Sequence, residues 1–244
     1  RLRTRTLRED EREMVFEFEN GAIWRFDKAT SQAAAVSLPL EEKQDPTTIP
    51  MPNPDNPDRY QGVGEIARYF REQGYFTLAK VHGVFSGVWY LFRPLDRLFM
   101  DMVDAPDFVH SMVDLVADYS FRTARQFLER GVDCILLNDD LGSSSGLLFS
   151  PQAYSEFFQP WHKKFADLCQ SYGGYLQIHS HGNINGIIPQ LMETGVHILN
   201  PVGPTDGMTL EELLRDHGHQ TAFAGGISKR IGEMTGDELD RHLD

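Results

Sequence analysis

The order of apolar and polar residues predicts a β-hairpin near the start of the chain. Residues 15–19 and residues 22–26 each alternate apolar and polar side chains, which is the period of a half-buried strand. Between them lies Asn20-Gly21, a dipeptide typical of tight hairpin turns. Residues 1–12 are charged and show no period, so we expect them to form an irregular lead-in.

Beyond the hairpin, residues 39–60 are rich in Pro, Asp and Asn and are predicted to be a linker. Helical spacing or capping residues then predict helices over 64–73, 106–130, 151–172 and 184–193, with another opening near residue 209. Continuous apolar runs predict strands over 75–81, 132–137, 175–178, 196–199 and 221–224. Trp89, Tyr90 and Arg93 are interpreted as lying in the loop after the first of these strands.

Strands that alternate with helices indicate parallel pairing and right-handed crossovers. The pattern gives five such strand–helix units, whereas a closed barrel needs eight in roughly 250 residues. The chain is therefore either an open doubly wound sheet or a barrel of which some units are not in this sequence. Periodicity does not separate these two architectures. We treat residues 1–244 as one domain, with 1–60 as extension and linker and 61–244 as the repeated units.

Composition narrows the classes of function. The 244 residues include 23 Lys and Arg against 36 Asp and Glu, which gives a net charge of −13. Nucleic-acid-binding surfaces are basic, so we expect no nucleic-acid partner. The sequence contains no apolar run of the roughly 20 residues that span a membrane. Two cysteines give no disulfide framework, and together these features favour a soluble, cytoplasmic protein.

Polar residues and glycines gather just after the predicted strands, where parallel α/β folds place their ligands. Two histidines, His179 and His181, are the sharpest feature. Side chains two residues apart on an extended segment share a face, so both imidazoles can converge on one zinc ion. The alternative is a pair of histidines bonded to water and backbone.

Two aspartates follow the second of these strands. Because successive side chains alternate in direction, only one of Asp139 and Asp140 can face the opening of the fold. That carboxylate could act as a general acid or base, bind a substrate N–H or orient a histidine, whereas capping of the following loop is the structural alternative.

Five further residues are candidates for substrate binding, because they lie at or just after strand ends: His82, Tyr90, Arg93, Asn200 and Gly226. Each also has a structural interpretation, such as packing for an aromatic ring or a tight turn for Gly225-Gly226. Cys134 is predicted to be a core residue in mid-strand. Cys169 lies near the end of a helix, on the opposite rim, and is a poor ligand candidate.

Several of these segments occur in an order that resembles a known family. The segments are Asp139-Asp140-Leu141-Gly142, Leu147-Leu148-Phe149-Ser150-Pro151 with Tyr154, Phe157, Phe158 and Pro160, His179-Ser180-His181-Gly182-Asn183, Gly195-Val196, Asn200-Pro201 and Gly225-Gly226-Ile227. This order resembles the superfamily of uroporphyrinogen decarboxylase and the cobalamin-dependent methyltransferases, over about residues 60 to 230. The resemblance implies a (β/α)8 barrel, incomplete in this chain and preceded by the β-hairpin extension.

The resemblance also implies a zinc-dependent methyltransferase or demethylase that uses a corrinoid as co-substrate. Methyltransferases of this superfamily carry His-x-Cys-Gly at the third strand end, with a later cysteine completing the zinc site. Here His179 matches the histidine and His181 stands in place of the cysteine, while Asp139, Asp140 or His82 could supply a third ligand. Expected partners are a small methyl donor or acceptor and a corrinoid-carrying protein, and a homodimer is compatible with the sequence.

Two other functions stay open. A tetrapyrrole decarboxylase needs clustered cations for the carboxylates of its substrate, and near the expected opening the sequence offers Lys80, Arg93, Arg97, Lys229 and Arg230. The arginine-rich loop expected of that branch is not found. A non-catalytic barrel that binds a corrinoid or porphyrin is the third hypothesis.

Overall fold

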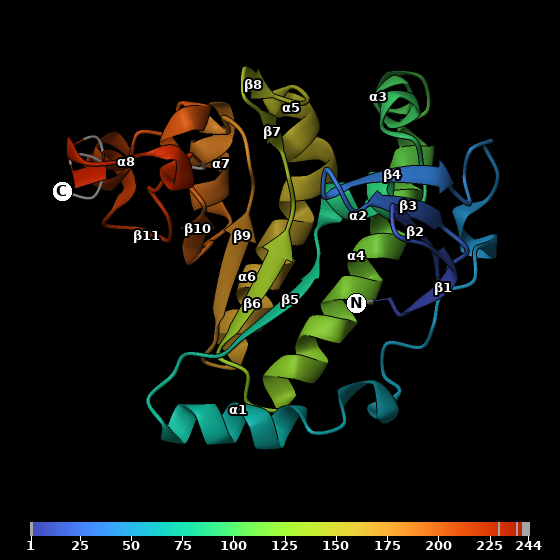
Figure 1. The fold of residues 1–244 in the computed structure, drawn as a ribbon, viewed down its shortest axis with the longest axis horizontal. Coiled ribbons are helices and arrows are strands. Elements are labelled where there is room, and N and C mark those ends of the chain that lie inside the picture. Colours follow the sequence, from blue (N-terminus) through green and yellow to red (C-terminus); the bar gives the residue numbers. More distant parts are fainter. Residues whose placement is uncertain (1, 229, 238, 241–244) are drawn as a thin grey trace.

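The computed structural model describes residues 2–228, 230–237 and 239–240 (Figure 1). The strands are β1 (Thr4–Glu9), β2 (Glu13–Phe18), β3 (Ile23–Asp27), β4 (Gln32–Ser37), β5 (Leu78–His82), β6 (Cys134–Asn138), β7 (Gly142–Ser143), β8 (Gly146–Leu147), β9 (Tyr175–His179), β10 (Ile198–Asn200) and β11 (Ala222–Phe223). The α-helices are α1 (Val63–Glu72), α2 (Val84–Leu91), α3 (Leu95–Asp104), α4 (Pro106–Glu129), α5 (Pro151–Ala153), α6 (Gln159–Ser171), α7 (Ile188–Glu193) and α8 (Leu210–His217).

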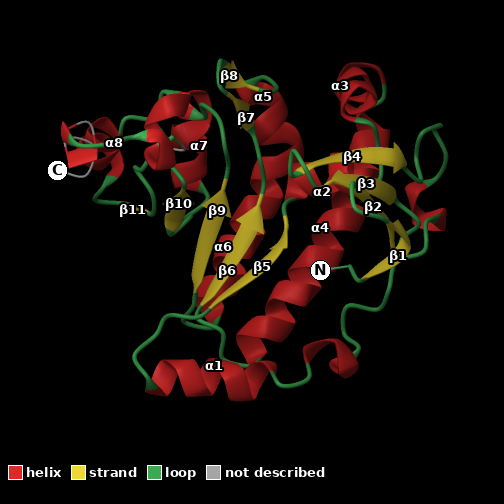
Figure 2. Ribbon diagram, in the orientation of Figure 1, coloured by secondary structure: helices red, strands yellow, loops and turns green. Residues whose placement is uncertain are grey.

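The N-terminal segment is a four-stranded antiparallel sheet in the order β1-β2-β3-β4 (Figure 2). The predicted hairpin is confirmed as β2 and β3. The prediction that residues 1–12 are irregular is wrong, because β1 pairs with β2 along most of its length. Every side chain of β1 is exposed, so no apolar alternation marks it, and cross-strand pairs such as Arg5 with Glu17 support it instead.

This sheet packs against α2. The indole of Trp24 stacks on the ring of Tyr90 at a centroid distance of 4.0 Å, and its Nε1 donates to the Tyr90 carbonyl at 2.9 Å. The side-chain amide of Asn20 donates to the Leu91 carbonyl at 2.8 Å. The N-terminal sheet thereby fixes the position of Tyr90.

The second sheet has five parallel strands in the order β11-β10-β9-β6-β5. Their order in space follows their order in the sequence without a reversal, so the sheet has no topological switch point. That order excludes the doubly wound alternative and is the order of a (β/α)8 barrel, of which the chain forms an incomplete part. Helix α4 packs on β5 and β6, and α6 packs on β9.

Two helices, α2 and α3, occupy the segment in which we predicted a loop around Trp89, Tyr90 and Arg93. Helix α2 is buried nearly all round, with Val84, Phe85 and Val88 fully inaccessible. A helix without a polar face gives no amphipathic period, which explains why the pattern did not reveal it. Trp89 and Tyr90 therefore lie on a helix, and Arg93 lies between α2 and α3 (Leu95–Asp104). No helix in the described part of the chain is both long enough and apolar enough to cross a membrane.

His197 gives the fold an acid-sensitive contact. Its Nδ1 accepts a hydrogen bond from the Leu176 N–H at 3.1 Å, and burial lowers its pKa below the ordinary value of 6.5. His197 therefore takes up a proton more readily in the unfolded chain than in the folded one. Its contribution to the free energy of unfolding is fully present above about pH 6.5 and is lost as the pH falls through the lowered pKa of the folded state.

We expect the free energy of unfolding of the wild type to fall more steeply between about pH 7 and about pH 5 than that of His197→Asn. Urea denaturation at several pH values measures both slopes. Equal slopes would show that His197 does not contribute to acid sensitivity.

Candidate active site

Four polar side chains lie in one row across the ends of the parallel strands. The strand register pairs His82 with Asn138, Asn138 with His179, and His179 with Asn200. Directly paired residues on parallel strands point to the same face of the sheet, so one polar side chain from each of β5, β6, β9 and β10 faces a common space.

The row fixes the tautomer of His179. The side-chain amide of Asn200 donates from Nδ2 to the Ala224 carbonyl at 2.7 Å, which orients its Oδ1 towards His179. This oxygen lies 2.5 Å from His179 Nδ1, so Nδ1 must carry the proton. In the neutral ring, the lone pair of His179 is therefore on Nε2, which can bind a metal ion or accept a proton from a substrate. Metal-binding histidines commonly show this outer hydrogen bond.

The second histidine lies close to the first. The rings of His179 and His181 are perpendicular, with centroids 4.7 Å apart. The backbone N–H of His181 donates to Asp140 Oδ1 at 2.9 Å. The structure thus brings together the two predicted metal ligands and one of the predicted aspartates.

The third zinc ligand that we considered is not in place. Within the described residues, no group of three or more His, Cys, Asp or Glu side chains is arranged to hold a metal ion. Asp139, Asp140 and His82, which we considered as a third ligand, do not form such a group with His179 and His181 in the described part of the chain. Both cysteines are buried, and burial raises the pKa of Cys134 and of Cys169 to about 12, so neither thiol is prepared to bind a metal.

The structure separates the two adjacent aspartates. Asp139 is fully buried and accepts the backbone N–H groups of Val84, Phe85 and Ser86 at 2.9, 3.0 and 2.7 Å. Its carboxylate therefore caps the N-terminus of α2 and complements the helix dipole. A Cβ at Gly83 would lie 2.4 Å from Asp139 Cγ, so glycine is needed for this close approach. Asp139 positions α2, whereas Asp140 lines the opening.

Sequence reasoning missed two residues behind Asp139. His162 is fully buried, and its Nε2 lies 2.9 Å from Asp139 Oδ2, while its Nδ1 lies 2.9 Å from the Tyr154 hydroxyl. Burial and the nearby Asp139 charge raise the pKa of Tyr154 well above its ordinary value, so its O–H donates to Nδ1 and Nε2–H donates to Asp139. Tyr154 opens a π-helical turn within the segment predicted as one helix, and no spacing rule links it to Asp139.

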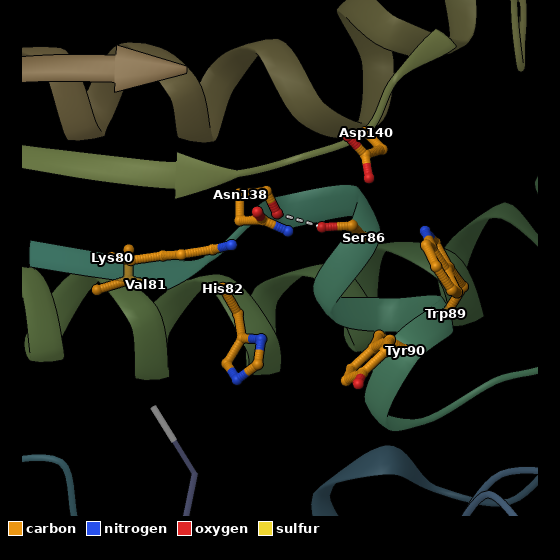
Figure 3. A pocket seen from close by; sticks show the side chains of 8 residues that line it. All are labelled: Lys80, Val81, His82, Ser86, Trp89, Tyr90, Asn138 and Asp140. Atoms are coloured by element: carbon orange, nitrogen blue, oxygen red, sulfur yellow. Dashed lines mark hydrogen bonds between the residues drawn. The ribbon is translucent and has the colours of Figure 1, made fainter. Parts of the chain in front are cut away.

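A pocket of about 240 Å³ adjoins the polar row (Figure 3). It is lined by Lys80, Val81, His82, Ser86, Trp89, Tyr90, Asn138 and Asp140. The predicted substrate-binding residues His82 and Tyr90 thus line one cavity together with Asp140. Lys80 entered the sequence analysis only as a nearby cation, and Ser86 was missed because its helix was not predicted.

Arg93 and Gly226 have structural contacts instead. Arg93 Nε pairs with Asp101 Oδ2 at 2.8 Å, and both side chains are almost fully buried. The guanidinium also donates to the Leu40 carbonyl at 2.6 Å, so Arg93 joins α3 to the linker and does not line the pocket. The N–H of Gly226 donates to the Pro201 carbonyl at 3.0 Å, and a Cβ there would lie 2.7 Å from Leu210.

Comparisons with known proteins agree with the order of the strands. The model of the uroporphyrinogen decarboxylase (URO-D) family matches residues 25–242. This chain belongs to that family. Among solved structures, it is similar to a methyltransferase from Methanosarcina mazei, with a TM-score of 0.56 and 18% sequence identity, over 87% of this chain and 70% of that one. No curated protein matches the sequence.

Proposed function

We propose that this URO-D family chain carries a methyltransferase site that works with a corrinoid, with His179 and His181 as zinc ligands. The observation that supports the proposal most directly is the hydrogen-bonded Asn200 amide. It holds His179 as the Nδ1–H tautomer and leaves Nε2 as a ligand beside the His181 ring. The similarity to a methyltransferase supports the fold on which this site is built.

The donor set fits zinc in part. Imidazole nitrogen is a preferred zinc ligand, and an outer partner such as Asn200 is typical of such sites. Catalytic zinc usually has three protein ligands, and His179 and His181 would be two of them. When bound, zinc would supply Lewis acidity towards the methyl-bearing heteroatom or the methyl acceptor.

The chain's own residues would then have distinct tasks. Asp140 orients His181 through its backbone N–H, and Asn200 orients the ring of His179. The pocket beside them would hold the small methyl donor or acceptor. The corrinoid, carried by a separate protein, would approach the ends of the strands.

Uroporphyrinogen decarboxylation is less well supported, because two of the cations considered for it are engaged elsewhere and Lys229 lies outside the described residues. Arg93 is paired with Asp101, and Arg97 lies 3.1 Å from Glu42. Among the residues that line the pocket, Lys80 is the lysine or arginine that could meet a carboxylate.

Zinc analysis of protein purified without a histidine tag tests the proposal. We expect about one zinc per chain in the wild type and a loss of most of it in His179→Ala and in His181→Ala. His219→Ala, at an exposed histidine outside the site, is the matched control and should keep its zinc. A wild type without zinc, together with unchanged methyl exchange with cobalamin in His179→Ala, would refute the proposal. Cobalamin that binds tightly but is never methylated or demethylated would instead favour a non-catalytic barrel.

A further inference from the structure

Figure 3 shows that the charges of the pocket lie on opposite sides. Lys80 points in from one side, while Asp140, Trp89 and Tyr90 lie on the other. We propose that this pocket binds a small zwitterion, with a methylated ammonium against Asp140 and the aromatic rings and a carboxylate towards Lys80. The role of the zwitterion as a substrate rests on the proposed methyltransferase function. Its binding to the pocket does not depend on turnover and can be tested separately.

The Asp140 side has the features that recognise an ammonium group. A methylated ammonium is stabilised by aromatic faces and a nearby carboxylate, because its charge is spread over C–H groups that need no hydrogen bonds. Trp89 and Tyr90 present their rings at 81° to each other with centroids 5.8 Å apart, which forms a corner rather than a flat wall. Tyr90 is held from behind by the Trp24 ring, so the corner is preorganised.

The carboxylate of Asp140 is itself held in place. One oxygen accepts the His181 N–H at 2.9 Å, which fixes the side chain at the edge of the pocket. The same contact places the ammonium end of a ligand at the edge of the pocket that adjoins the His181 backbone.

The Lys80 side of the pocket favours a ligand that also carries a negative charge. Lys80 supplies a positive charge in the same cavity, across from Asp140. A carboxylate on the ligand would be attracted by Lys80, whereas a simple cation would be repelled by Lys80 and a simple anion by Asp140.

Calorimetric titration with three ligands of similar shape separates these possibilities. Trimethylglycine carries both charges, choline carries only the ammonium, and 3,3-dimethylbutanoate carries only the carboxylate, with carbon in place of nitrogen. On wild-type protein treated with a chelator, we expect trimethylglycine to bind at least about 10-fold more tightly than either analogue, because it alone meets both charges.

Two variants test which side of the pocket binds the ammonium and which binds the carboxylate. Asp140→Asn should remove most of the preference for trimethylglycine over 3,3-dimethylbutanoate, because the ammonium then loses its carboxylate partner and keeps only the aromatic rings. Lys80→Met should remove most of the preference for trimethylglycine over choline. Asparagine can still accept the His181 N–H, and Lys80 is exposed, so both variants should fold. Circular dichroism checks this.

Equal affinity for the three ligands, no binding of trimethylglycine, or preferences unchanged in both variants would overturn the assignment. Because the protein in these titrations holds no zinc, a failure of the zinc proposal leaves the binding result intact. Zinc that binds to the histidine pair while trimethylglycine does not bind would overturn the zwitterion assignment alone.

Discussion

Replacement of Asp139 by asparagine is expected to lower the free energy of unfolding by about 2–5 kcal/mol, because each buried N–H group that loses its acceptor costs roughly 1–3 kcal/mol. Asp139 accepts three backbone N–H groups at the start of α2 and the Nε2–H of His162, all without access to water. The amide of asparagine would turn two N–H groups towards these donors. At least one buried donor would then lose its acceptor.

The neighbouring residue provides the matched control. Asp140→Asn makes the same chemical change one position later, on a partly exposed side chain that accepts one N–H. Its asparagine oxygen can still accept, so the loss should stay below about 1 kcal/mol. Urea denaturation of the wild type and both variants gives the comparison. Similar losses in the two variants would mean that the buried network around Asp139 does not dominate the stability of α2.

The contrast between these two aspartates also shows how far the sequence could lead. Alternation along an extended segment correctly implied that only one carboxylate faces the opening. Which one does so depends on α2, since its N-terminal N–H groups surround Asp139. That helix is buried on all sides, and a pattern of uniformly apolar residues does not distinguish it from a strand or a packed loop.

The sequence predicted which polar residues lie at the strand ends, but it did not predict that they line up in one row. His82, Asn138, His179 and Asn200 each come at or just after the end of a strand predicted from an apolar run. Their placement at one level depends on the register between strands, which is set by long-range packing. The same limit left barrel and open sheet unresolved, because local periodicity does not record which strands are neighbours in space.

Strand β1 was not predicted because it is exposed, whereas α2 was not predicted because it is buried. A sequence pattern detects a strand through burial of one face, and β1 buries neither. Its backbone hydrogen bonds to β2 and cross-strand contacts such as Arg5 with Glu17 define it instead. Such contacts are visible only once the partner strand is in place.

Asn200→Leu is expected to weaken zinc binding by about 10- to 100-fold while His179 and His181 stay unchanged, because outer partners of metal-binding histidines have effects of this size. The leucine removes the oxygen that receives His179 Nδ1–H and the amide that bonds Ala224. Without that acceptor, His179 is free to rotate and to adopt the other tautomer, in which Nε2 carries a proton and cannot bind the metal. Competition with a chelating zinc indicator measures the affinity.

Asn185→Leu is the control for the loss of a side-chain amide. Its Nδ2 likewise donates to a backbone carbonyl, that of Gly207 at 3.0 Å, but no hydrogen bond joins it to His179. This variant should bind zinc as the wild type does. If Asn200→Leu and Asn185→Leu bind zinc equally well, the tautomer of His179 does not depend on Asn200. The orientation of the imidazole would then have to come from its packing against the His181 ring.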